Sequence, residues 1–299
     1  MAIVERIARF GDNERLVGVT CEDRERRRGP CALLFNAGVV HRVGAHRLNV
    51  RIARALAGAG FPSLRFDLSG LGDTPPARHA LGYEEQSIQD ISAAMDWIAA
   101  HYDMDAAIPI GMCSGADNAY RAAQVDERIA GAVLMDPYAY AAPGGHVDRI
   151  AKRVANPDWW AQKFSTARAP SRAEPEAPPN LSAHDEDGND GDANADDDAF
   201  ADRYAMDPDR GAPPAEEFGA TLKAITDADR PIFILYTNFV EDKLQSEKQF
   251  RQQFSAFDFS DHLTVSVRPD VDHTYSLKSS QTEVLAAIVN WFQSNWPAP

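Results

Sequence analysis

Residues 108–123 read IPIGMCSGADNAYRAA, an apolar run followed by a cysteine between two glycines and then an alanine-rich segment. The apolar start predicts a buried strand and the alanine-rich end predicts a helix. Between them, Gly111 and Gly115 allow a sharp turn that pushes the side chain of Cys113 out at the carboxyl end of the strand. A buried cysteine in an ordinary glycine-rich turn would have the same motif, so the interpretation needs support from elsewhere in the chain.

Short apolar runs alternate with segments of helical periodicity along most of the chain. The strands are expected at 32–35, 63–66, 108–110, 131–135, 231–236 and 262–267, and the helices at 48–59, 88–100, 116–123, 243–254 and 281–296. This alternation predicts an α/β fold with a mostly parallel central sheet flanked by helices. Residues 4–10 and 16–21, joined by a turn at 11–13, predict an antiparallel pair at the edge of that sheet.

The alternation is interrupted between residues 141 and 227, which predicts a core of 1–140 and 228–299 carrying a lid or cap insertion. Trp159 and Trp160 lie in a part of the insertion with near-helical spacing of apolar residues. These two tryptophans either line an acyl-binding pocket or anchor the insertion to the core. Residues 170–214 are acidic and rich in Pro, Ala, Asn and Gly with almost no aliphatic side chains, so we expect this segment to be mobile.

Composition narrows the class of protein. The formal net charge of -15 argues against binding to nucleic acid or to an anionic membrane surface, because few cations could neutralise phosphates. Three cysteines make no disulfide framework, and no secretory signal or long apolar span is present, so we expect a cytoplasmic protein. The acidic run 185–192 lacks glycine at the sixth position of a calcium loop, so no metal or cofactor is predicted. The oligomeric state stays open.

A histidine near the end of the chain is the expected partner of Cys113. His273 follows the last predicted strand in Asp270-Val271-Asp272-His273-Thr274-Tyr275, where it can act as a general base toward the cysteine. The other seven histidines are expected in loops or on helix surfaces. For the acid that orients the base, position after the strand 231–236 favours Asp242 over Glu241, and Asp136, after the strand 131–135, is a third candidate.

These motifs resemble those of the α/β-hydrolase superfamily over nearly the whole chain outside the acidic segment. The resemblance rests on Asn36-Ala37-Gly38, His41-Arg42, Leu64-Arg65-Phe66-Asp67, Gly70-Leu71-Gly72-Asp73, the cysteine turn and Asp272-His273-Thr274. The chain is most similar to bacterial hydrolases associated with exosortase and exopolysaccharide loci. Cysteine replaces the usual serine of the superfamily, as it does in dienelactone hydrolases and polyhydroxyalkanoate synthases.

The resemblance implies an oxyanion hole made of two backbone N–H groups, those of Val39 and Ser114. It also implies a Cys113–His273–Asp242 triad that attacks an acyl carbonyl and forms a thioester with a small-molecule substrate, either free or bound to a carrier. Hydrolysis of an ester, thioester or lactone is the favoured outcome. The alternatives are an acyltransferase or cyclase, and a binding module without catalysis. Arg42 either binds a substrate anion near the first helix or is a solvated charge.

Overall fold

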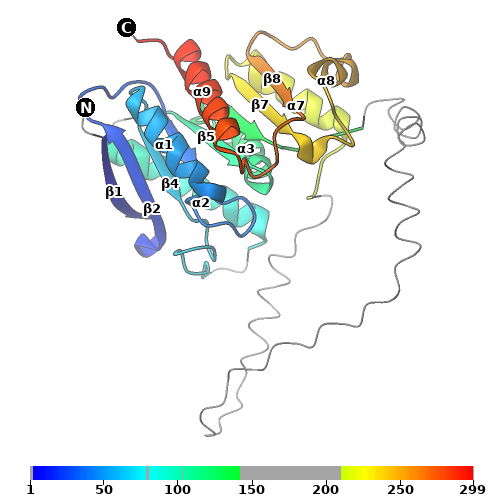
Figure 1. Ribbon diagram of the computed structural model, residues 1–299. Helices are drawn as coiled ribbons and strands as arrows, with labels where there is room; N and C mark the ends of the chain where they lie inside the picture. The colour runs from blue at the N-terminus through cyan, green and yellow to red at the C-terminus, as the bar shows by residue number, and fades with distance from the viewer. Residues whose placement is uncertain (1–2, 79–80, 103, 142–209, 299) are drawn as a thin grey trace, which may run out of the picture. The chain divides into compact units, whose positions relative to one another are not determined.

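The computed structural model describes residues 3–78, 81–102, 104–141 and 210–298 (Figure 1). Among them, eight strands form one sheet in the order β1-β2-β4-β3-β5-β6-β7-β8. In chain order these are β1 (Ile3–Phe10), β2 (Leu16–Asp23), β3 (Cys31–Leu34), β4 (Ser63–Phe66), β5 (Ala107–Met112), β6 (Ala132–Met135), β7 (Ile232–Thr237) and β8 (Leu263–Arg268).

The sheet has a small antiparallel part and a larger parallel part. β1 pairs antiparallel with β2, and β2 pairs antiparallel with β4. All the other neighbours are parallel, from β4 through to β8. The predicted α/β fold and its antiparallel edge pair are therefore confirmed.

The strand order reverses between β3 and β5. From β3 the chain moves outward to β4, whereas β5 lies on the other side of β3 and starts the run to β8. At such a point the loops that leave the carboxyl ends of the two strands run in opposite directions, which opens a crevice for a ligand. Residues 35–42 and the Cys113 turn are the two segments that leave the sheet here.

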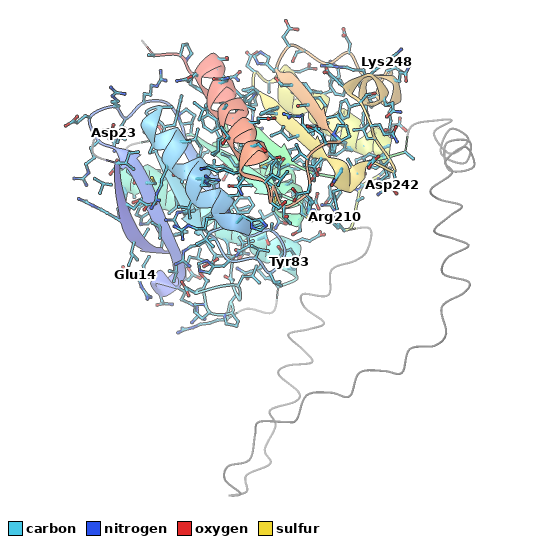
Figure 2. The ribbon with its side chains drawn as sticks, viewed as in Figure 1. Glu14, Asp23, Tyr83, Arg210, Asp242 and Lys248 are labelled. Carbon is cyan, nitrogen blue, oxygen red and sulfur yellow. The ribbon has the colours of Figure 1, made fainter. Side chains whose placement is uncertain are left out.

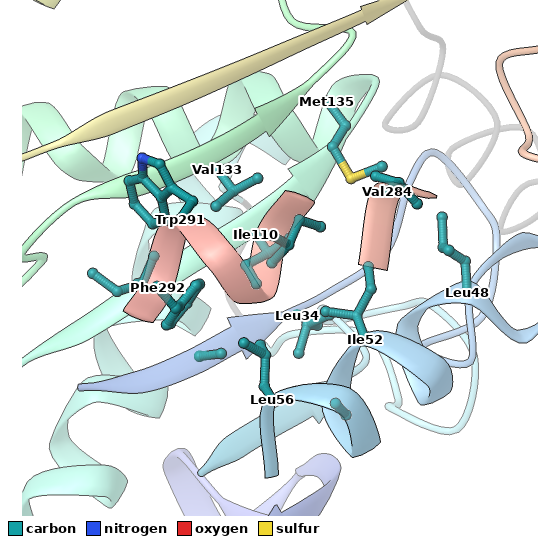
Figure 3. Packing of buried hydrophobic residues seen from close by; sticks show 14 of the residues in the cluster. Leu34, Leu48, Ile52, Leu56, Ile110, Val133, Met135, Val284, Trp291 and Phe292 are labelled. Atoms are coloured by element: carbon teal, nitrogen blue, oxygen red, sulfur yellow. The ribbon is translucent and has the colours of Figure 1, made fainter. Parts of the chain in front are cut away.

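Helices α1 (Leu48–Gly58) and α9 (Lys278–Asn295) lie together on one face of the sheet (Figure 1). Both present apolar residues at helical spacing to the strands, and the resulting core is almost completely buried (Figure 3). Its members include Leu34, Leu48, Ile52, Leu56, Ile110, Val133, Met135, Val284, Trp291 and Phe292. This core holds the strand ends in fixed positions from one side.

Helices α2 (Tyr83–Tyr102), α3 (Ser114–Val125) and α7 (Ala215–Asp227) pack on the opposite face, and α8 (Glu247–Gln253) lies beside β8. An aromatic cluster joins α3 to α7: the Phe218 ring lies 5.0 Å from Tyr120 and 6.0 Å from Tyr138 between ring centroids. The side chain of Phe218 is fully buried.

Helix α7 differs from the expected domain boundary, since the predicted insertion extended to residue 227. The helix begins after Pro214 and buries Phe218, Leu222 and Ile225, which follow each other at helical spacing. The described residues from Arg210 onward belong to the same compact unit as the sheet. Trp159, Trp160 and residues 170–209 of the acidic segment lie outside the described residues. In the described part, no helix combines the length and apolarity that crossing a bilayer requires.

Candidate active site

The Cys113 turn connects β5 to α3 through a strained backbone. Cys113 has φ 55° and ψ −125°, a conformation that L-residues rarely adopt. Its N–H donates to the carbonyl of Met135 on the neighbouring strand, at 2.8 Å. A Cβ atom on Gly111 would overlap the carbonyl of Gly115, and one on Gly115 would lie 2.6 Å from the carbonyl oxygen of Asn36. The two glycines are therefore required by close backbone contacts, and strain of this kind is typical of functional turns.

His273 lies in the loop between β8 and α9, and its ring contacts Cys113. A hydrogen bond joins the imidazole to the thiol. The neighbouring Asp272 fixes the loop, because its carboxylate accepts hydrogen bonds from the backbone N–H groups of Thr274 and Ser276 at 3.1 and 2.9 Å. Phe239 stacks on the imidazole with the ring centroids 4.0 Å apart. The structure thus brings together the two residues that the sequence analysis paired.

The carboxylate against His273 belongs to Asp136, at the carboxyl end of β6. Its Oδ2 lies 2.7 Å from Nδ1 of His273. The carboxylate is completely buried and accepts two more hydrogen bonds, both of 2.6 Å, from the N–H and the hydroxyl of Thr237. Asp136 is held in place from both sides and fixes the orientation of the imidazole.

The preference for Asp242 over Asp136 is corrected by this geometry. Glu241 and Asp242 are exposed residues in the turn that follows β7; Figure 2 labels Asp242. Nδ1 of His273 already faces Asp136, and the ring's remaining hydrogen bond goes to Cys113. The physical reason is sheet register: β6 and β7 are adjacent, Met135 pairs with Leu235, and Asp136 therefore emerges beside Thr237 under the histidine loop.

The charges of the Cys113–His273 pair reinforce each other. Burial opposes ionisation of the thiol, but the hydrogen bond with His273 and the positive charge of Arg210 outweigh it and hold the Cys113 pKa below its usual range. Burial likewise disfavours a charged imidazole, yet the hydrogen bonds with Asp136 and Cys113 raise the His273 pKa to about 9. Each member of the pair thus favours the charged form of the other.

Ser114 connects the cysteine turn to the loop after β3. Its hydroxyl accepts a hydrogen bond of 2.8 Å from the N–H of Gly38, and its own N–H is directed at the sulfur of Cys113. The Gly38 N–H is therefore already used in a hydrogen bond. The adjacent residue, Val39, is largely exposed. It lies in a turn that is closed by a 3.1 Å hydrogen bond from the N–H of Val40 to the carbonyl of Ala37. These positions suit the expected pair of donors, Val39 and Ser114.

Arg42 does not occupy the place expected of a substrate-binding residue. Its guanidinium forms ion pairs with Asp67 and, at 2.7 Å, with Asp73. Its backbone N–H donates to the same Asp67 at 2.7 Å, and Asn36 donates to that carboxylate at 2.8 Å. The structure corrects the expectation of a substrate anion at Arg42, because the side chain joins the loops that follow β3 and β4.

Sequence reasoning missed two charged residues beside the cysteine. Nη1 of Arg210 lies 3.5 Å from Sγ of Cys113 and 3.3 Å from Oδ2 of Asp117, a buried residue on α3 (Figure 2 labels Arg210). The position of Asp117 was a usable signal, since it follows Cys113 by four residues and one turn of the predicted helix therefore places a carboxylate near the cysteine. Arg210 lies within the acidic segment 170–214 and has no comparable signal. The expected pocket residues Trp159 and Trp160 lie outside the described residues.

Comparison with known proteins agrees with the observed fold. The family model described as alpha/beta hydrolase fold matches residues 33–236, more than half of the chain. An esterase of Pyrococcus furiosus superimposes with a TM-score of 0.57 at 13% identity, covering 99% of this chain and 92% of that one. A cold-adapted esterase from an Arctic intertidal metagenomic library gives 0.54 at 14% identity, with 99% and 95% covered.

A hypothetical protein of Pseudomonas aeruginosa gives a TM-score of 0.54 at 17% identity, covering 98% of this chain and 94% of that one. No curated protein matches the sequence. Identities this low carry information about fold only, whereas the family match is one of sequence. The chain belongs to the α/β-hydrolase fold family.

Proposed function

We propose that this protein is an ester or thioester hydrolase that works through a covalent acyl-Cys113 intermediate. The observation that carries the proposal is the continuous hydrogen-bonded series from the Cys113 thiol through the His273 ring to the buried carboxylate of Asp136. A nucleophile, a base and an orienting acid in this order form the minimal apparatus for acyl transfer. Lactones, which are cyclic esters, belong to the same substrate class.

The proposed reaction has two steps. The Cys113 thiolate attacks the acyl carbonyl, and the resulting oxyanion is stabilised by the N–H groups of Val39 and Ser114. The carbon–oxygen or carbon–sulfur bond then breaks, His273 donates its proton to the departing alcohol or thiol, and the acyl group stays on the sulfur. In the second step His273 removes a proton from water, the water attacks the thioester, and the thiolate is released with the acid product.

Intact-protein mass spectrometry tests the proposal. The wild-type protein is mixed with a set of p-nitrophenyl esters, acyl thioesters and lactones, and samples are quenched in acid within milliseconds to seconds. We expect an added acyl mass on Cys113 that decays in water while acid product accumulates. Cys113→Ala should show neither the adduct nor turnover.

A matched control separates the nucleophile from the other thiols of the chain. Cys21 and Cys31 are both completely buried, and burial raises their pKa, so Cys21→Ala should acylate as the wild type does. Turnover that survives in Cys113→Ala, or acylation at another residue, would refute the proposal. An adduct that persists in water and is released by an amine or alcohol would instead identify an acyltransferase.

A further inference from the structure

Arg210 brings a positive charge into direct contact with the nucleophile. Besides its 3.5 Å contact with the sulfur of Cys113, Nη1 donates to the carbonyl of Asp136 at 3.2 Å. Its guanidinium lies over the ring of Tyr138, 5.6 Å from the centroid. Only 16% of the side chain is exposed. The guanidinium is thus fixed on three sides beside the reacting atom.

The backbone of Arg210 is also held in position. Nη2 of Arg121, on α3, donates to the carbonyl of Arg210 at 3.3 Å, and the same group forms a 2.6 Å ion pair with Glu84 at the start of α2. Arg210 itself has φ 53° and is followed by Gly211 at φ 57°. A left-handed backbone conformation is strained in a residue with a large side chain, and such strain persists only where the surrounding structure imposes it.

Asp117 lies on the other side of the guanidinium and competes for its charge. The carboxylate is 1% exposed, one turn of α3 beyond the cysteine, and 3.3 Å from Nη1 of Arg210. Burial raises the pKa of Asp117 to about 7, although the charges of Arg210 and Arg121 oppose that rise; Glu84 adds to it. An ionised Asp117 would neutralise part of the field that Arg210 exerts on the sulfur.

We propose that Arg210 is a catalytic residue that stabilises the Cys113 thiolate, and that Asp117 is a positioning residue that sets how much of the Arg210 charge reaches the sulfur. The inference rests on the proposed function in that a thiolate is the attacking species. Two cations, His273 and Arg210, then face one sulfur, so the thiolate can persist even in molecules whose imidazole has lost its proton. The positive charge that acts on the sulfur can therefore change without any movement of the backbone, because it depends on whether Asp117 beside the guanidinium is ionised.

The rate of iodoacetamide alkylation at Cys113, followed by mass spectrometry from pH 5 to 10, tests this proposal without any substrate. Arg210→Gln should raise the apparent thiol pKa by about one pH unit and, at pH values below the wild-type thiol pKa, slow alkylation by about tenfold. Arg210→Lys should restore part of the loss, because its charge is kept on a shorter group. Asp117→Asn should act in the opposite direction and lower the apparent thiol pKa by about half a pH unit.

The matched control is Arg54→Gln, which removes a guanidinium on α1 that pairs with Glu5 on β1, at the edge of the sheet remote from Cys113. It should leave the alkylation profile unchanged. In the double variant Arg210→Gln/Asp117→Asn, most of the Asp117→Asn effect should vanish, since it acts through the guanidinium. A merely structural role would not give opposite shifts in the two single variants. Circular dichroism verifies that each variant is folded.

Two results would overturn the inference: a thiol pKa in Arg210→Gln equal to that of the wild type, or shifts of the same sign in Arg210→Gln and Asp117→Asn. These readings need no ester, so they are distinct from a failure of the proposed function. A wild-type protein that alkylates as described but forms no acyl-Cys113 with any ester would refute the hydrolase proposal. The role of Arg210 toward the thiolate would then stand on the alkylation data.

Discussion

A carboxylate that orients a catalytic imidazole acts by holding one tautomer in one place. Asp136 meets this requirement, because it is fully buried, is held by Thr237 and lies 2.7 Å from His273. Its own backbone adopts φ 51°, which aims the side chain under the histidine loop. The residue-level expectation is that the base depends on Asp136 and not on the exposed Asp242.

Asp136→Asn should lower kcat/KM for ester hydrolysis by roughly tenfold to a hundredfold. The loss is expected to be smaller than in serine enzymes, because a thiolate forms without a strong orienting acid. Asp242→Asn is the matched control and should retain wild-type kinetics. Equal losses in the two variants would show that Asp242 takes part in catalysis after all.

The pH profile of kcat/KM should be bell-shaped. The active pair requires a thiolate, which forms above the lowered thiol pKa, and a protonated imidazole, which is lost as the pH rises through the His273 pKa of about 9. The alkaline limb should therefore fall near pH 9 in the wild type. In Asp136→Asn the imidazole loses its stabilising charge, so that limb should move to lower pH. An alkaline limb that does not move would contradict the pairing of Asp136 with His273.

At the scale of elements, the turn between β5 and α3 depends on two glycines that could be recognised in the sequence. Gly111 has ordinary backbone angles, and its importance comes from the approach of the Gly115 carbonyl. The expected strands and helices around it were correctly located. Helix α7 was missed because the acidic segment before it obscured a regular pattern of apolar residues that begins after Pro214.

Gly111→Ala should lower the free energy of unfolding by about 3 kcal/mol or more, because the added methyl group collides with backbone that cannot move aside. Any folded fraction should alkylate slowly at Cys113. Gly58→Ala is the matched control: Gly58 ends α1 with open space around its Cα, so alanine there should be neutral or stabilise by about 0.5–1 kcal/mol. Urea unfolding measures both. Similar stabilities for the two variants would contradict the steric argument.

At the scale of the whole molecule, a buried carboxylate links the active site to stability. The pKa of Asp117 is raised to about 7 in the folded protein, against about 4 in an unfolded chain. The folded state therefore binds more protons between these values, and stability falls as the pH rises through that window. Ionisation of Asp117 next to Arg210 therefore lowers the stability of the folded protein.

Asp117→Asn removes this titration. The difference in free energy of unfolding between the variant and the wild type should therefore shift in favour of the variant by roughly 2–4 kcal/mol when the pH is raised from 4 to 8. Urea unfolding at the two pH values measures the difference. Asp261→Asn, an exposed site, is the control and should show little change between them. A difference for Asp117→Asn that does not depend on pH would show that the carboxylate is not protonated in the folded protein.

The sequence by itself determined the α/β fold, the glycine-flanked cysteine turn and the histidine that faces it. Those features depend on local periodicity, on backbone angles and on the order of strands along the chain, all of which can be recognised from neighbouring residues. Only the tertiary structure decided that Asp136 meets His273, that Arg42 is taken up by Asp67 and Asp73, and that Arg210 reaches Cys113. Such pairings depend on strand register and on loop paths between residues distant in the chain, so several carboxylates and arginines with similar local surroundings remain equivalent until the sheet is assembled.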